Sequence, residues 1–171
     1  MAGPVKGAGR ITRLALLTAI ALTIFLVEAQ LPALTAIPGI KLGLSNGVLI
    51  FAVYLLNVPT AFMLLALKLV LSAALFAGFG ALPYAAAGGV LSVAVMALLR
   101  RVKGLTPVTV SMAGGAAHNI GQVAMAMLVT QTPGLVGYMG LLMLAGMVCG
   151  ALTGICAQGV MRHLPHLRAK K

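Results

Sequence analysis

The sequence predicts an all-α integral membrane protein, formed by a single membrane domain with six transmembrane helices. Hydrophobic residues make up 61% of the 171 residues and charged residues 8%, whereas soluble domains average about 25% charged residues. The apolar residues fall into six runs, separated by turn-forming or basic residues. A chain this apolar has too few charged side chains to cover its surface in water. We therefore expect a multi-pass protein of the cell membrane.

A helix needs about 20 mainly apolar residues to cross a bilayer, and most of the runs have this length. Their approximate bounds are residues 11–31, 42–57, 59–79, 81–99, 107–131 and 136–161.

The first run is expected to be a permanent helix rather than a cleaved signal peptide. Glu28 and Gln30 stand where a signal peptidase needs small residues, and the apolar stretch is too long. A loop with two prolines and a glycine, residues 32–41, follows it. The second run is the shortest and stops at the turn sequence NVP.

The other four runs begin and end at similar signals. The third starts at Pro59, which suits the first turn of a helix, and ends at two nearby glycines. The fourth is closed by the basic sequence RRVKG. The fifth starts at Pro107 and is closed by the turn TPG, and the sixth is followed by Arg162 and a basic tail.

The positions of lysine and arginine predict the orientation. If the N-terminus is cytoplasmic and all six runs span, only Lys41 lies outside and Lys68 lies within the third run. The cytoplasmic side then holds Lys6, Arg10, Arg13, Arg100, Arg101, Lys103, Arg162, Arg168, Lys170 and Lys171. Cytoplasmic loops carry such an excess, so we expect both termini inside. The net charge of +11 follows from this topology, and we expect no nucleic-acid partner.

The scarcity of acidic residues excludes several enzyme classes. Glu28 is the only carboxylate side chain, which excludes a paired-carboxylate glycosidase. The chain has no aspartate to hold the Mg²⁺ of a diphosphate substrate, and no ATP-binding loop of the G-x-x-x-x-G-K-[ST] type. Cys149 and Cys156 are too far apart along one helix for a disulfide and have no metal-ligand spacing. We expect no catalysis, no cofactor and no metal ion.

Polar side chains at membrane depth are costly and usually face the bundle interior. Lys68 lies near the middle of the third run, where it either reaches up to the interface or faces the interior. His118, Asn119 and Gln122 form the densest polar group, in the fifth run. They either bind a solute or make hydrogen bonds between helices.

A second polar group surrounds the start of the second run, in the segment PGIKLGLSN (residues 38–46). Free N–H groups at a helix start attract anions, Lys41 adds a positive charge, and Ser45 and Asn46 add hydrogen bonds. The alternative is a helix cap with an interfacial lysine. Glu28, near the outer end of the first run, pairs with Lys41 or Lys68 or holds a donor of a solute.

Small residues at a four-residue spacing let helices approach closely in lipid. Gly146, Gly150 and Gly154 form such a stripe in the sixth run, and packing inside the chain explains it. Ala15 and Ala19 have the same spacing near the cytoplasmic end of the first run. They either pack inside the chain or contact a partner.

Four segments in order, PGIKLGLSN, AAAGGVLSVAVMALL, AGGAAHNIGQ and LLMLAGMVCGALTG, resemble the Gx transporter family, which is also labelled heptaprenyl diphosphate synthase component I. The resemblance covers residues 14 to about 154. That family is similar in size and topology to the substrate-binding S components of energy-coupling factor transporters. The resemblance implies a six-helix bundle that captures a micronutrient from outside, with a transmembrane coupling protein and two cytoplasmic ATPases as partners. It also implies that Ala15 and Ala19 contact the coupling protein.

Three functions follow. The first is a substrate-binding subunit of an uptake transporter, with a small-molecule solute and membrane lipid as its other contacts. The second is a nonenzymatic membrane partner of a polyprenyl diphosphate synthase, and the third is a small carrier that binds a proton at Glu28 or His118. The depth of the polar residues favours the first. The candidate solute-binding residues are Glu28, Lys41, Ser45, Asn46, Lys68, His118, Asn119 and Gln122.

Overall fold

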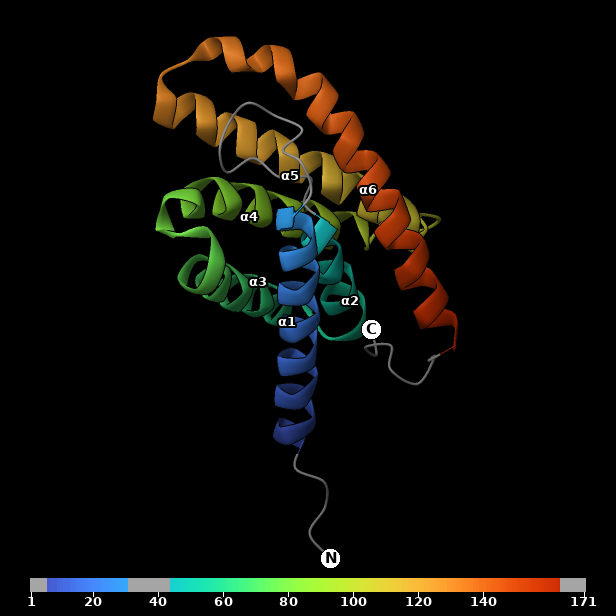
Figure 1. Cartoon of the computed structure of the whole chain (residues 1–171). Coiled ribbons are helices and arrows are strands. Elements are labelled where there is room, and N and C mark those ends of the chain that lie inside the picture. The colour runs from blue at the N-terminus through green and yellow to red at the C-terminus, as the bar shows by residue number, and fades with distance from the viewer. Residues whose placement is uncertain (1–5, 31–43, 164–171) are drawn as a thin grey trace, which may run out of the picture.

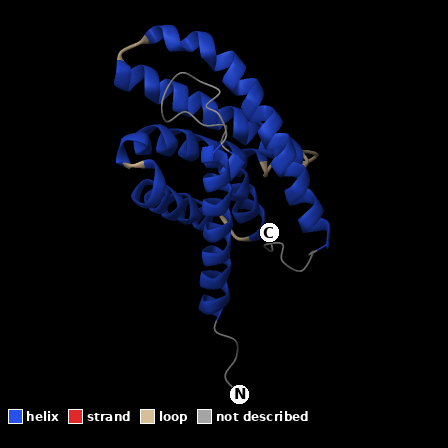
Figure 2. Ribbon diagram, viewed as in Figure 1, coloured by secondary structure: helices blue, strands red, loops and turns tan. Residues whose placement is uncertain are grey.

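The computed structural model describes residues 6–30 and 44–163, and this part of the chain is helical with no strand (Figures 1 and 2). The main helices are α1 (Lys6–Gln30), α2 (Val48–Leu55), α3 (Val58–Ser72), α4 (Leu82–Leu99), α5 (Pro107–Thr130) and α6 (Val136–His163). Short 3-10 or π turns flank them at η1 (Leu44–Gly47), η2 (Ala73–Ala77), η3 (Phe79–Ala81) and η4 (Pro133–Leu135). The all-α prediction is confirmed, and each apolar run contains one main helix.

The turn signals of the sequence become helix caps. Asn57 precedes α3, and its side-chain oxygen accepts a hydrogen bond of 2.9 Å from the backbone N–H of Thr60. Thr106 precedes α5 in the same way, and its hydroxyl oxygen accepts from the backbone N–H of Thr109 at 3.2 Å. Both helices have a proline in the first turn, where its missing N–H costs nothing.

The second predicted helix, 42–57, corresponds to two consecutive helical elements in the described part of the chain. The α-helix there is α2, with only eight residues, and a 3-10 turn, η1, occupies residues 44–47 before it. Eight residues rise about 12 Å, whereas the hydrocarbon core is about 30 Å thick. Therefore α2 alone is too short to cross a membrane, and the spanning of the second run stays a prediction.

Four helical segments are long and apolar enough to span a bilayer, which indicates a membrane-embedded protein. They are Ile11–Gln30, Val58–Phe76, Phe79–Leu99 and Pro133–His163. Helix α5 has 24 residues but is not among them, because its histidine, asparagine and glutamine lower its mean hydropathy. The number of spans and the orientation of the termini stay predictions.

The helices α3, α4, α5 and α6 lie next to one another in chain order (Figure 1). Helix α1 runs across the direction of α3 and α4 and contacts α3, α2 and η1. The short α2 lies at the centre of the core, where Leu49, Ile50 and Val53 are fully buried. They pack in one cluster with residues of the neighbouring helices, including Leu64, Val93 and Val110.

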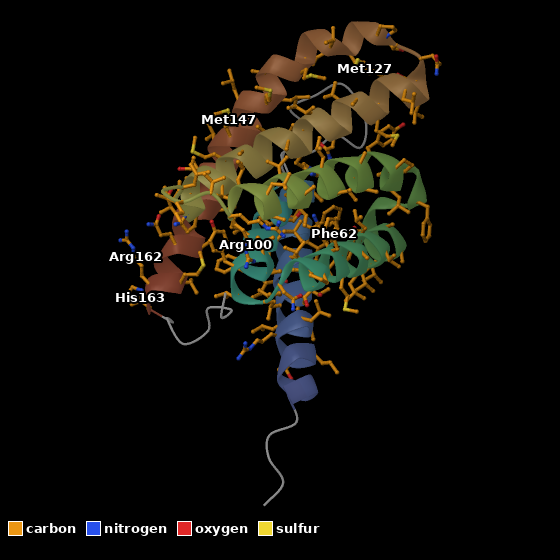
Figure 3. The ribbon with its side chains drawn as sticks, turned by 180° about the vertical axis from the view of Figure 1, so that it is seen from behind. Phe62, Arg100, Met127, Met147, Arg162 and His163 are labelled. Atoms are coloured by element: carbon orange, nitrogen blue, oxygen red, sulfur yellow. The ribbon has the colours of Figure 1, made fainter. Side chains whose placement is uncertain are left out.

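Arg100, just after α4, ties the end of α2 to the rest of the bundle (Figure 3). Its guanidinium donates a hydrogen bond to the backbone carbonyl of Val53. The same guanidinium lies 6.0 Å from the centre of the Tyr54 ring. The last carbonyls of a helix have no partner within the helix, so a half-buried arginine that reaches one of them stabilises the short α2.

We expect Arg100→Ala to lower the free energy of unfolding by about 1.5–3 kcal/mol, because hydrogen bonds to charged groups contribute this much. Thermal unfolding in detergent measures the change. The matched control is Arg101→Ala, since Arg101 is exposed and should change stability by less than about 0.5 kcal/mol. Equal effects of the two substitutions would show that Arg100 does not hold α2.

Candidate functional site

Two adjacent glycines in α4 let α3 and α5 come close to it. A Cβ atom on Gly89 would lie 2.5 Å from a methyl carbon of Leu65 in α3. A Cβ atom on Gly88 would lie 2.6 Å from the backbone oxygen of His118 in α5. A side chain at Gly88 would collide with the backbone of α5, whereas one at Gly89 would displace the Leu65 side chain of α3.

Lys68 and His118 come together beside these glycines. Both are buried, with exposed fractions of 4% and 3%. The imidazole of His118 makes a hydrogen bond to the backbone of Gly88 and lies close enough to Lys68 to feel its positive charge. Of the two alternatives for Lys68, the structure places its side chain inside the bundle rather than at the surface.

Gln122 belongs to the same layer. It follows His118 by one turn of α5, is 2% exposed, and lies against the position that a Cβ of Gly88 would take. Its Oε1 atom has no hydrogen-bond partner within the described ranges. Ser92, one turn after Gly88 in α4, is also buried. We call Lys68, Ser92, His118 and Gln122 the polar layer.

Asn119 faces a different neighbour. It is fully buried, and its Nδ2 donates to the backbone carbonyl of Leu142 in α6 at 2.5 Å. Its Oδ1 has no partner in the part of the chain that the structure describes. The structure therefore separates the predicted polar group of α5, because His118 and Gln122 face α4 whereas Asn119 faces α6.

Glu28 and Ser45 form a second buried contact, at the junction of α1 and η1. The backbone N–H of Ser45 donates to Oε2 of Glu28 at 3.3 Å, and the two residues are 2% and 5% exposed. Glu28, the only acidic side chain in the sequence, therefore accepts a hydrogen bond from the start of η1. Lys41 lies outside the described residues, and so does the side chain of Asn46.

The predicted stripe of small residues in α6 lies against α5. A Cβ on Gly146 would lie 2.5 Å from the backbone oxygen of Gly115, and one on Gly154 would lie 2.8 Å from the Cα of Val108. Gly150 lies between them, against the backbone of Ser111. The stripe is used for packing within this chain.

Ala15 and Ala19 lie on the exposed face of α1. The buried face of the same turns carries Leu14 and Thr18. Within the described residues, the two alanines are therefore accessible to lipid or to a partner.

Sequence reasoning missed the role of the α4 glycines and of Ser92. The pair Gly88-Gly89 was visible as an AGG sequence that occurs again before His118. Two adjacent glycines inside a helix lower the stability of that helix. Their presence in the sequence could therefore have indicated that another helix packs closely against them.

The family match agrees with these motifs. A family described as heptaprenyl diphosphate synthase component I matches residues 17–160. The chain belongs to this family. The match includes Glu28, η1, the polar layer and Asn119, and it confirms the resemblance that the sequence motifs indicated. No curated protein and no solved structure matches the chain, so the residue roles rest on its own contacts.

Proposed function

We propose that this family member is the membrane substrate-binding subunit of an energy-coupling factor-type uptake transporter, with no catalysis of its own. The observation that carries the proposal is the polar layer. It places a lysine, a histidine and a glutamine inside an apolar helical bundle, each at most 4% exposed. Burying such groups without a use is costly, and intramembrane ionisable residues usually belong to a solute pathway.

The chemistry of the layer suits recognition rather than reaction. Lys68 supplies a positive charge, and His118 and Gln122 supply hydrogen-bonding groups from the facing helix. Binding sites of this kind are mostly apolar with a few polar groups that fix orientation. The solute class that we propose is a small micronutrient or cofactor precursor. The chain has no nucleotide-binding loop, so separate ATPases must supply the energy.

The exposed alanines of α1 are the proposed contact with the coupling protein. We expect the double substitution Ala15→Leu and Ala19→Leu to reduce co-purification of the coupling protein and ATPases at least tenfold, because two larger side chains prevent close helix approach. Affinity purification from mild detergent followed by mass spectrometry measures how much coupling protein and ATPase is recovered. Solute retained by the purified subunit should not change.

The control for this variant is Ala124→Leu, which adds the same group at an exposed position of α5. It should leave the complex intact. A double α1 variant that still recovers the ATPases in full would disprove the proposed contact.

The second candidate is a nonenzymatic membrane partner of a polyprenyl diphosphate synthase, and the family description favours it. A chain without aspartate lacks the Mg²⁺ ligands that prenyl transfer needs, so under this candidate another protein performs the chemistry. Stable co-purification with a soluble, aspartate-rich synthase would support it.

A further inference from the structure

Two buried side-chain oxygens have no hydrogen-bond donor within residues 6–30 and 44–163. They are Oδ1 of Asn119 and Oε1 of Gln122, and their residues are 0% and 2% exposed. Nδ2 of Asn119 donates to the carbonyl of Leu142. That bond fixes which end of the amide is the NH₂ group, so the atom left over is an acceptor. Most buried polar atoms have a partner, and two orphaned acceptors therefore point to a missing donor.

The two acceptors come from neighbouring positions of one helix. Asn119 and Gln122 are three residues apart on α5, and such residues are neighbours on a helix surface, with Cβ atoms about 5–6 Å apart. Gln122 borders α4 at Gly88, and Asn119 borders α6 at Gly146. The pair therefore lies where three helices meet.

An apolar cluster begins next to the pair. Its buried residues are Val123 and Ala126 of α5 and Leu142 of α6, and Tyr84, Met127 and Met139 pack against them (Met127 is labelled in Figure 3). Leu142 also accepts the hydrogen bond of Asn119, so the side-chain amide of Asn119 borders the apolar cluster.

We propose that Asn119 and Gln122 form an acceptor pair that binds N–H or O–H groups of the transported solute. The inference rests on the proposed function and names its substrate class. The solute carries at least two hydrogen-bond donors, such as amide, amine or hydroxyl groups, next to an apolar part. Fully ionised inorganic diphosphate does not fit the pair, because its oxygens accept hydrogen bonds and do not donate them.

The test counts donors directly. The purified protein is incubated with an aqueous extract of bacterial cells and washed, and the retained compounds are analysed by mass spectrometry in H₂O and in D₂O. The mass difference gives the number of exchangeable N–H and O–H hydrogens. We expect the retained compounds to have at least two exchangeable hydrogens. We also expect Gln122→Met to retain at least tenfold less of these compounds.

Folding is checked in the same samples. Gln122→Met removes an unpaired buried acceptor, so its thermal midpoint should equal or exceed that of the unmodified protein. Gln30→Met makes the same chemical change at an exposed position and should keep full retention. Gln122→Leu gives a second comparison if the methionine variant does not fold.

Each failure has its own meaning. The proposed acceptor pair would be wrong if the retained compounds had fewer than two exchangeable hydrogens, or if folded Gln122 variants retained as much as the unmodified protein. Neither outcome would contradict the proposed function. Radiolabelled inorganic diphosphate that is held by the unmodified protein and lost from Gln122→Met would also overturn the solute class. An unmodified protein that retains no compound would count against the proposed function and the inference together.

Discussion

Gly146→Ala is expected to destabilise the bundle strongly. A Cβ atom at this position would lie 2.5 Å both from Nδ2 of Asn119 and from the backbone oxygen of Gly115. Backbone atoms of α5 have no rotamer by which to move aside, so the two helices must separate. Overpacking of this kind costs about 1–3 kcal/mol and sometimes more. Thermal unfolding of the purified protein in detergent should show a midpoint several degrees lower.

Gly140→Ala is the matched control, because Gly140 lies in the same helix with nothing within 4 Å of its Cβ position. Alanine is better than glycine inside a helix by roughly 0.5–1 kcal/mol, so this variant should be as stable as the unmodified protein or more stable. Helix propensity alone would stabilise both variants, so equal losses at both glycines would mean that the close contact of Gly146 with α5 does not explain the effect.

Lys68→Met is expected to have the largest effect on solute retention. Methionine is similar in length and apolar, so it should fill the space of the buried lysine and keep the fold. The variant removes the positive charge beside His118, however, and a hydrogen bond to a charged group contributes about 1.5–3 kcal/mol. Retention of solute from a bacterial extract should therefore fall by roughly 10- to 100-fold.

Lys103→Met is the control for the loss of charge, because Lys103 is exposed in the turn after α4. Its retention should match that of the unmodified protein. If Lys68→Met retained as much solute as Lys103→Met, the buried lysine would have only a structural role.

The apolar runs and their flanking turns were sufficient to predict most of the fold. Helix ends at Asn57 and Thr106 were predictable because capping is local. The length of α2 was not predictable in this way. Its residues are as apolar as those of a spanning helix, and the 3-10 turn η1 that precedes it, in contact with α1 and α6, has no local sequence signal.

The site was predictable as a set of residues but not as an arrangement. Burial of Lys68, His118 and Gln122 followed from their positions in apolar runs. Which residues face each other depends on how the helices pack. Here the α4 glycines determine the packing, because Gly88 has no side chain and leaves space for His118 and Gln122. The hydrogen bond between Glu28 and the backbone N–H of Ser45 could not be predicted either, because it depends on how η1 packs against α1.

The most direct test of substrate-binding function is affinity purification of the tagged protein from mild detergent, with mass spectrometry of the co-purifying proteins and the retained small molecules. The proposed function predicts a transmembrane coupling protein, ATPase subunits and a retained solute that Lys68→Met loses. A soluble, aspartate-rich prenyl synthase recovered with no retained solute would contradict it.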